Sequence, residues 1–514
     1  MSENTNIPSQ KLPDQSIGGK RWPLLLASLL VLNAIIQVTL RVLISDSLDL
    51  DEAEQVFFSQ WLVLGYGTQP PLYNWIQQVF FAVIPNQVLA LSLFKHMILL
   101  AIFALMYKTT RLLVKPSAAA VSAVAMLFLI PEFSFEAQRD LTHTVLAALS
   151  CMGFFYLLVR ILLKTNVAKD FILLGLAIGC CLLSKYNTLL LIVPMLTAAA
   201  SITELRKRIF GKQAWLALLV AALLCAPHWY WLCNNLNEAT AQSIHKMHLA
   251  EAGSALDTRI TGLKEMAGAF FGLAGLLLSV VAVVFWRSPI RIPSPSGSDL
   301  ALARLFKRYL IALPCLMLAA VVFGVGNFKG RWLLPSLIFL PTITCFYLFH
   351  FRRVTQCQVR WIFVIAMAIG LAVPVALGVR VAGAKPGHYK RLNEPYRELV
   401  QKFPVSSNFL LITDQVRIAG NLKHHLPDNV SVVSAEMSYL PAAPRTHQTV
   451  VLAWREKRPG SNTTAEQIPA KLLAFAKDQT GRQVIEFDGV TTIFAPYKYG
   501  IKQQSLNLAW FRID

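Results

Sequence analysis

The chain has 514 residues, of which 55% are hydrophobic and only 15% are charged, and its mean hydropathy is +0.51. A soluble globular chain carries about 25% charged residues, so this composition excludes a purely soluble protein. The net charge of +20 could indicate nucleic-acid binding, but the basic residues cluster in short segments between apolar runs, as they do in membrane proteins.

Eleven apolar runs predict a polytopic α-helical membrane protein, since a crossing needs about 20 residues, with a range of about 17–25. The runs are Trp22–Ile44, Val88–Tyr107, Pro116–Phe135, Leu141–Leu163, Phe171–Leu183, Tyr186–Ala200, Ala214–Trp231, Met266–Trp286, Tyr309–Val325, Trp332–Phe349 and Trp361–Val379. The fifth and sixth runs are short, so a single kinked helix would also fit. Two crossings are favoured because they keep both flanking basic loops on one side.

The basic residues of the loops predict the orientation, because cytoplasmic loops are the richer in Lys and Arg. One set of alternate loops is poor in them and contains chiefly Arg139, Lys185, Lys246, Arg259, Lys329 and Arg331. We therefore predict a cytoplasmic tail at residues 1–21 and a transmembrane domain at 22–380, whose first periplasmic loop is 45–87. An odd number of crossings places residues 381–514 in the periplasm.

The first outer loop is acidic and then amphipathic. Its acidic residues, with no Lys or Arg among them, are Asp46, Asp49, Asp51, Glu52 and Glu54. Apolar residues from Ala53 to Leu64, and again after Pro70-Pro71, recur at three and four residues, with Gln55 on the polar side of the first stretch. This spacing predicts two amphipathic helices that lie in the membrane interface. A solvated acidic loop before two interfacial helices is the simpler interpretation, but the helices would also form a shelf for a lipid substrate.

The same loop carries a family motif, formed by Asp51-Glu52-Ala53, Gly65-Tyr66, Pro70-Pro71-Leu72 and Trp75. It resembles the motif DEAxYWxWSxxLxxGYxxxPPLxxW of bacterial GT-C glycosyltransferases, the glycosyltransferase family 39-like relatives of protein O-mannosyltransferases and of the lipid A aminoarabinose transferase. The resemblance implies a GT-C bundle with interfacial juxtamembrane helices and a small periplasmic domain. It also implies an inverting transfer of a sugar from a polyprenyl-phosphate donor on the outer face.

By this resemblance Asp51 is the candidate general base, with Glu52 beside it and Asp49 as the weaker alternative. A carboxylate suits this role because the attacking hydroxyl must lose its proton, and an anion near the sugar ring stabilises the charge that develops there. Tyr66 and Gln69 are candidate substrate contacts. Gln69 stands where the family usually has Lys or His, so the resemblance does not extend to a charged contact with the donor phosphate at this position.

Further candidates lie where other runs reach the outer side. Asp140 matches a second acidic residue that relatives place at the outer start of the fourth helix, although Asp is also a preferred N-cap residue. His143, one turn further, is a candidate substrate contact or a partner inside the bundle. Lys95 and His96 fall within the second run, where ionisable residues are functional candidates by default.

A basic group for the donor phosphate is expected at three outward-facing positions. The segment from Lys329 to Pro335 resembles the family element K-x-x-R-Y/W-x-x-P, and its Arg331 could stabilise a leaving phosphate through planar paired donors. Snorkelling of Lys329 and Arg331 at a helix end is the alternative. Lys185 lies in a tight outer turn where relatives often carry Thr-Lys-Gly. His228, near the outer end of the seventh run, is a candidate substrate contact.

The C-terminal tail reads as a small α/β domain. Its predicted strands are Phe409–Thr413, Val430–Val433, Thr449–Ala453 and Val484–Phe487, and its predicted helices are Gln415–His425 and Ala465–Lys477. Earlier in the chain, Asn234–Lys264 is long enough to fold over a site as a lid.

Two classes of function fit this organisation. The first is a glycosyltransferase of the bacterial inner membrane that acts on the periplasmic face, with a lipid, a glycan or a protein as the acceptor. The second is a transporter or flippase for an envelope lipid or glycan precursor. Transporter sites lie near the bilayer midplane between repeated halves, whereas here the charged candidates lie at outer helix ends and no repeat is visible, so we favour the enzyme. We predict no cofactor and no metal, with a divalent cation in the acidic loop as the open alternative.

Overall fold

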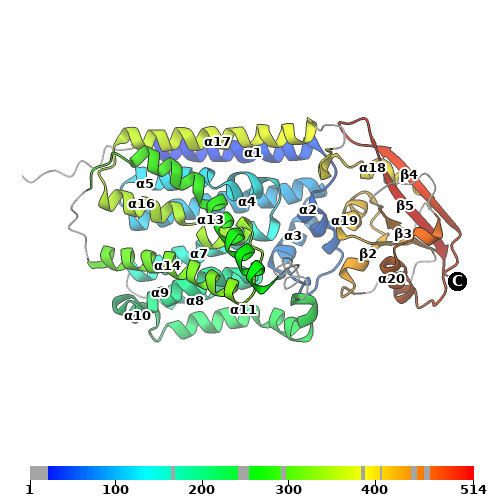
Figure 1. Ribbon diagram of the computed structural model, residues 1–514, viewed down its shortest axis with the longest axis horizontal. Coiled ribbons are helices and arrows are strands. Elements are labelled where there is room, and N and C mark those ends of the chain that lie inside the picture. Colours follow the sequence, from blue (N-terminus) through cyan, green and yellow to red (C-terminus); the bar gives the residue numbers. More distant parts are fainter. Residues whose placement is uncertain are drawn as a thin grey trace, which may run out of the picture.

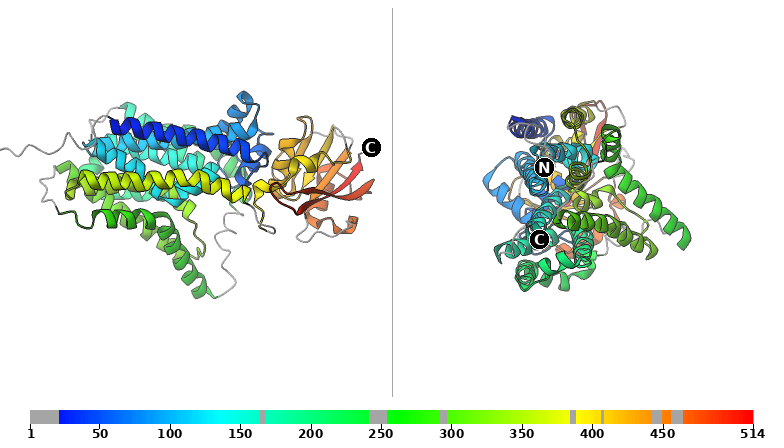
Figure 2. Two further views of the ribbon diagram at one scale, coloured as in Figure 1. Left: turned by 90° about the horizontal axis from the view of Figure 1, so that it is seen from above. Right: turned by 90° about the vertical axis from the view of Figure 1, so that its left-hand side faces the viewer.

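The computed structural model describes residues 21–163, 168–240, 254–290, 297–383, 388–405, 408–441, 449–455 and 464–513. Long helices run side by side along the long axis of the molecule, and a sheet domain sits at one end of the bundle (Figure 1). In a view turned by 90°, this end-to-end arrangement of bundle and sheet domain is unchanged (Figure 2). Residues 1–20 of the predicted cytoplasmic tail and residues 241–253 of the predicted lid lie outside the described ranges.

The bundle is built from helices and a few short irregular turns. Its helices are α1 (Arg21–Ile44), α2 (Leu50–Phe58), α3 (Leu72–Val83), α4 (Gln87–Leu113), α5 (Ser117–Met126), α6 (Ala137–Arg139), α7 (Thr142–Leu163), α8 (Ala168–Ser184), α9 (Leu189–Ala200), α10 (Thr203–Ile209), α11 (Ala214–Asn234), α13 (Ala255–Phe285), α14 (Gly297–Val322), α15 (Gly330–Leu337), α16 (Leu340–Phe351) and α17 (Gln356–Ala382). The turns are η1 (Leu127–Leu129), η2 (Glu132–Glu136) and η3 (Tyr186–Thr188).

Seven helices in the described ranges are long and apolar enough to cross a membrane, and the count rises to ten if each of three bent helix pairs forms one span. The bends measure 77° between η1 and η2, 119° between α9 and α10, and 49° between α15 and α16. A 24-residue helix such as α1 is about 36 Å long, which exceeds the roughly 30 Å hydrocarbon core. The remaining predicted run coincides with α8, which has 17 residues.

The fifth and sixth runs form two separate helices. The first, α8, ends at Ser184 and the second, α9, starts at Leu189, with the turn η3 between them. Their neighbours also differ, because α8 packs against α7 and α11 whereas α9 packs against α14. A single kinked helix is therefore excluded.

The helix α2 exists as predicted, but it does not lie on the membrane interface. Its apolar residues Phe57 and Phe58 belong to a core shared with the C-terminal domain, and α2 packs against α19 (Val416–His425). The opposite side is buried as well, since Gln55 is only 2% exposed. The amphipathic pattern thus serves a protein interface. The second helix, α3, buries its polar face in the bundle and exposes Val79 and Val83, as an interfacial helix would.

The C-terminal domain is a five-stranded mixed sheet in the order β2-β1-β3-β5-β4. The strands are β1 (Phe409–Thr413), β2 (Ser431–Ser434), β3 (Thr449–Trp454), β4 (Gly489–Pro496) and β5 (Gln503–Arg512). Strand β1 pairs parallel with β2 and β3, and β5 pairs antiparallel with β3 and β4. The helices are α18 (Tyr396–Val400), α19 and α20 (Ala470–Thr480), with short turns at Arg391–Asn393, Ala435–Met437 and Ala465–Gln467.

Three of the four predicted strands are confirmed, and the fourth is wrong. Residues 484–487 form no strand; Ile485 and Phe487 instead pack against the apolar cluster beside α20. The apolar residues at 484–487 are therefore explained by side-chain packing and not by strand pairing. The hairpin of β4 and β5, which follows directly, was not predicted.

Candidate active site

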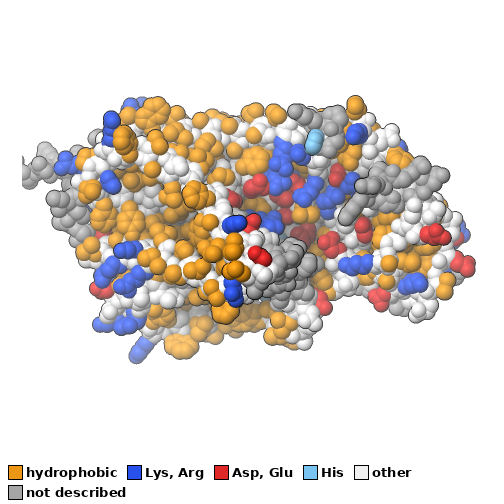
Figure 3. Space-filling model, in the orientation of Figure 1, with side chains coloured by type: hydrophobic (Ala, Val, Ile, Leu, Met, Phe, Trp, Pro, Cys, Tyr) orange, Lys and Arg blue, Asp and Glu red, His pale blue; other side chains and the backbone are white. Residues whose placement is uncertain are grey.

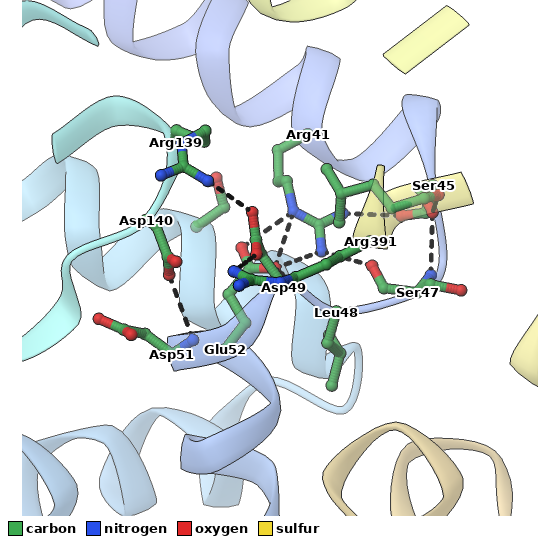
Figure 4. Close-up of polar contacts among 12 residues, drawn as sticks. Arg41, Ser45, Ser47, Leu48, Asp49, Asp51, Glu52, Arg139, Asp140 and Arg391 are labelled. Carbon is green, nitrogen blue, oxygen red and sulfur yellow. Dashed lines mark hydrogen bonds and ion pairs between the residues drawn. The ribbon is translucent and has the colours of Figure 1, made fainter. Parts of the chain in front are cut away.

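The acidic end of the first outer loop forms the first turn of α2. Asp49 is its N-cap and Glu52 its third residue, and together they make a capping box in which each side chain accepts a hydrogen bond from the backbone of the turn. In this arrangement two amides that would otherwise lack partners at the helix start are satisfied. The local sequence therefore folds the carboxylates of Asp49, Asp51 and Glu52 into a single turn (Figure 4).

Glu52 points toward α1 and is held by Arg41. The guanidinium donates to both carboxylate oxygens, with the shortest contact 2.6 Å from Nη2 to Oε2, and the same Oε2 accepts from the Asp49 amide at 3.0 Å. Glu52 is only 2% exposed. Burial opposes its ionisation, but the charge and hydrogen bonds of Arg41 outweigh burial and lower the pKa of Glu52 to about 2. This placement suits a residue that positions the loop, not a proton acceptor.

Asp49 is shared by two arginines from distant parts of the chain. Its Oδ1 accepts from Arg391 Nη1 at 2.8 Å and its Oδ2 lies 3.3 Å from Arg139 Nη1. Arg139 also pairs with Glu136 at 2.6 Å. Figure 4 shows Arg139 and Arg391 meeting at Asp49. Both oxygens of Asp49 are therefore engaged.

Asp51 and Asp140 lie together at the start of α7. The Asp51 amide donates to Asp140 Oδ1 at 3.3 Å, and Asp51 Oδ2 accepts from the Thr142 amide at 3.2 Å. Asp140 is 5% exposed, whereas Asp51 is half-buried. Burial and then the charges of Asp51, Asp49 and Glu52 raise the pKa of Asp140 well above its ordinary value.

The backbone beside this pair is strained. Leu141, directly after Asp140, has a positive φ of 69°, which is unfavourable for a residue with a Cβ atom. Such strain persists where surrounding contacts fix the backbone, and it gathers at functional sites. Here Lys95 donates to the Arg139 carbonyl at 3.4 Å and His96 bonds to Gln138 at 3.1 Å, so α4 holds the segment that presents Asp140.

The first turn of α7 continues from the carboxylates to a lysine. His143 faces Gln55 of α2, with 3.2 Å between their nitrogens, and packs against the ring of Tyr73. One residue further, Thr144 Oγ1 accepts from Lys185 Nζ at 2.7 Å. The predicted Asp51, Asp140, His143 and Lys185 are thus brought together around one helical turn.

A second group surrounds the turn η3. Tyr186 bonds to His228 at 2.9 Å, and the other ring nitrogen of His228 bonds to the Leu64 carbonyl at 2.7 Å. Asn187 donates to the Trp332 carbonyl at 2.7 Å, which ties the start of α15 to the same turn. Arg331, the neighbour of Trp332, is half-buried, and Lys329 immediately precedes α15. Arg331 is therefore the chain neighbour of a residue bonded to η3, the turn that directly follows Lys185.

Comparisons with known proteins identify the family. A family model described as dolichyl-phosphate-mannose-protein mannosyltransferase matches residues 68–231. The curated lipopolysaccharide core galacturonosyltransferase RgtB of Rhizobium johnstonii is 35% identical over 477 residues, which cover 92% of this chain and 94% of that protein. The chain belongs to the GT-C glycosyltransferases.

Further relatives agree with this assignment. RgtA of the same organism, also a lipopolysaccharide core galacturonosyltransferase, is 30% identical, with 95% of this chain and 97% of that protein covered. A solved structure of ArnT from Cupriavidus metallidurans bound to undecaprenyl phosphate aligns with a TM-score of 0.60 and 13% identity. That alignment covers 95% of this chain and 98% of ArnT, so the two share a fold along their whole length. The chain is thus a multi-pass membrane glycosyltransferase.

Two predicted substrate contacts of this glycosyltransferase, Tyr66 and Gln69, lie in the connection between α2 and α3. Tyr66 is buried against Phe58, and its hydroxyl donates to the Trp61 carbonyl at 2.8 Å. Tyr66 and Gln69 exchange backbone hydrogen bonds across a turn in which Gly67 has a φ of 64°. The family motif at these positions therefore shapes the connection between α2 and α3.

The predictions missed Arg41 and Arg391. Arg41 lies in the last turn of α1, near the acidic loop, and an arginine inside an apolar run would have been a usable signal. Arg391 gave no such signal, because it is 342 residues from Asp49 and only the fold brings the two together.

Proposed function

We propose that this protein transfers a sugar from a polyprenyl-phosphate donor to a lipopolysaccharide core acceptor on the periplasmic face of the bacterial inner membrane. One observation carries the proposal: the first turn of α7 binds the Asp51 carboxylate through the Thr142 amide and the Lys185 ammonium through the Thr144 hydroxyl. A base and a cation bound to one helical turn suit a reaction in which the acceptor hydroxyl loses a proton and the donor releases a phosphate.

Asp51 acts as the general base. The acceptor hydroxyl gives its proton to Asp51 as its oxygen bonds to the anomeric carbon, and the bond from that carbon to the phosphate oxygen breaks on the opposite face, with inversion. The leaving polyprenyl phosphate gains negative charge, which Lys185, Arg331 and Lys329 stabilise. His143 precedes Thr144, the partner of Lys185, and His228 bonds to Tyr186, the residue after Lys185, so both histidines are candidate substrate contacts beside this cation.

Asp140 supports Asp51 as a neutral neighbour. Its raised pKa favours the protonated form, which avoids a second negative charge beside the base. A protonated Asp140 also keeps a hydrogen-bond donor at the place where the acceptor hydroxyl must approach. Asp49 and Glu52 then hold the loop in position through their arginines.

The curated relatives support the choice of substrates. RgtB and RgtA are both named lipopolysaccharide core galacturonosyltransferases, so galacturonic acid is the sugar and the lipopolysaccharide core the acceptor that we propose. ArnT was solved with undecaprenyl phosphate, which supports a polyprenyl phosphate as the carrier. These relatives offer no support for a transporter.

The test is a transfer assay with purified protein, polyprenyl-phosphate-linked galacturonic acid, and lipopolysaccharide from a mutant that lacks this protein. We expect Asp51→Asn to reduce release of polyprenyl phosphate by at least about 100-fold, the usual contribution of a general base. The matched control is Asp46→Asn in the same loop, which pairs with Arg397 at 2.9 Å on the surface and should keep its activity.

An active Asp51→Asn variant would overturn the assignment of the base, provided that thermal unfolding shows both variants to be folded. Absence of transfer by the wild type with any lipid-linked sugar would overturn the proposed reaction. The metal-free mechanism stays a prediction, which chelation with EDTA tests directly.

A further inference from the structure

A cavity of about 450 Å³ lies beside Asp49. It is bounded by α1, by α17 and by residues 389–392, which lead into the C-terminal domain. Its basic lining consists of Arg41, Arg139, Arg380, Lys390 and Arg391. Lys and Arg side chains gather where the apolar surface of the bundle meets the C-terminal domain (Figure 3). The donor-side residues Lys185 and Arg331 do not line this cavity.

The charges of the cavity do not balance. Three of its five cations pair with carboxylates, namely Arg41 with Glu52, Arg139 with Glu136 and Asp49, and Arg391 with Asp49. Five cations against three carboxylates leave a net charge of +2. Arg380 and Lys390 carry this excess: no carboxylate partner is found for either in the described part of the chain, and Arg380 lies 6.0 Å from the ring of Phe135.

Part of the remaining lining is aliphatic and belongs to the membrane helices. Leu40 and Ile44 of α1 and Leu377 and Val381 of α17 form this part of the wall. A site that combines fixed cations with aliphatic side chains fits an amphiphile whose head group is anionic. A soluble anion would use only half of such a wall.

The cavity also adjoins the proposed reaction centre. Asp49 and Arg139 line it, and each is followed closely in the chain by a member of the carboxylate pair, Asp51 and Asp140. Because the arginines are already fixed by Asp49 and Glu136, little side-chain entropy is lost when a ligand binds there. A molecule anchored in the cavity would therefore present its neighbouring groups to Asp51.

We propose that this cavity binds a phosphate or carboxylate group of the lipid-borne acceptor, and so orients the acceptor hydroxyl toward Asp51. This inference rests on the proposed function, since it assigns the acceptor to one side of the carboxylate pair and the donor phosphate to the Lys185 side. Anionic lipopolysaccharide supplies both parts of the required chemistry, a charged head group and acyl chains.

The test uses the full-length protein in detergent and the double variant Arg380→Gln with Lys390→Gln, which leaves every described ion pair of the cavity intact. The probe is fluorescently labelled lipopolysaccharide, added without any donor. We expect its Kd to rise by about tenfold, because two charge-assisted contacts are lost. The control, Lys471→Gln with Lys477→Gln on α20, removes the same charge far from the cavity and should bind as the wild type does.

The binding measurement needs no turnover, so it separates this inference from the proposed reaction. Where transfer is measurable, the double variant should raise KM for the acceptor by a similar factor and leave KM for the donor unchanged. Wild-type affinity in the double variant would overturn the inference. So would a selective rise in KM for the polyprenyl-phosphate donor, because the cavity would then hold the donor.

Discussion

Asp140 is buried among three other carboxylates, which makes its ionisation costly for the folded protein. In the unfolded chain an aspartate titrates near pH 3.9, about its ordinary value. The raised pKa in the folded state means that folding favours the protonated form. The contribution of Asp140 to the free energy of unfolding is therefore complete at pH values below the pKa of the unfolded state. It declines as the pH rises through the pKa of the folded state.

We therefore predict that Asp140→Asn stabilises the protein more at pH 8 than at pH 5. Asparagine keeps the size and the acceptor oxygen of the side chain but cannot ionise, so the cost that grows with pH disappears. Thermal unfolding in detergent at several pH values measures the difference in melting temperature between variant and wild type. A difference that shrinks as the pH rises would contradict the prediction.

Asp51, Asp140 and Glu52 show how much of the candidate site the sequence could predict. Asp51 and Asp140 were both found from a short motif and a helix start, and the fold places them in contact. Glu52 was grouped with Asp51 because they are neighbours in the chain. Successive residues on a helix point in different directions, so Glu52 reaches Arg41 while Asp51 reaches α7.

At the scale of elements, the link between α6 and α7 stores backbone strain at Leu141. The positive φ of 69° costs about 1–2 kcal/mol for a residue with a Cβ atom, and glycine avoids this cost. Leu141 is also buried, so any truncation loses packing. Both Leu141→Gly and Leu141→Ala lose this packing, so the difference in stability between the two variants measures the backbone strain.

We predict that Leu141→Gly is more stable than Leu141→Ala by about 1 kcal/mol, the reverse of the usual order of these residues in helical segments. Melting temperatures of the two variants in the same detergent measure this difference. If the alanine variant is the more stable one, the backbone at Leu141 is not strained in solution.

The sequence predicted some helices and strands better than others, because an apolar pattern shows that a face is buried but not what buries it. Long apolar runs require a buried or membrane environment, so all of them are helical, although the runs Pro116–Phe135 and Trp332–Phe349 are each broken by a bend. The pattern of α2 was equally clear, but periodicity does not say what covers the apolar face, and α19 covers it here. Strand β4 was missed because five of its eight positions are half-buried and only two are buried, which blurs the alternation typical of a strand.

At the scale of the whole molecule, the C-terminal domain is fixed tightly to the first outer loop. Asn421 of α19 bonds to the backbone of Leu48 at 2.8 Å, and Ser45 donates to the Leu392 carbonyl at 2.6 Å. The helices α2 and α19 approach so closely that a Cβ atom on Gly420 would overlap the carbonyl oxygen of Ala53. The domain thus forms part of the wall behind the carboxylates.

We predict that Gly420→Ala lowers the melting temperature and reduces transfer, because α19 must move away from α2 and shift the turn that carries Asp51. The matched control is Gly153→Ala in α7, where an added Cβ atom meets no atom within 4 Å. Thermal unfolding and the transfer assay together provide the measurement. Equal behaviour of the two variants would show that the domain contact does not determine the position of α2.

The bond between Asp49 and Arg391 has a consequence for how the enzyme is made. The two residues are separated by 342 positions, so the ribosome completes and the membrane receives almost the entire bundle before Arg391 exists. Until then the acidic turn lacks one of its three arginines and the helix that covers α2. The nascent chain therefore enters the membrane before this turn has all its partners, and the turn is complete only when the last domain has been made.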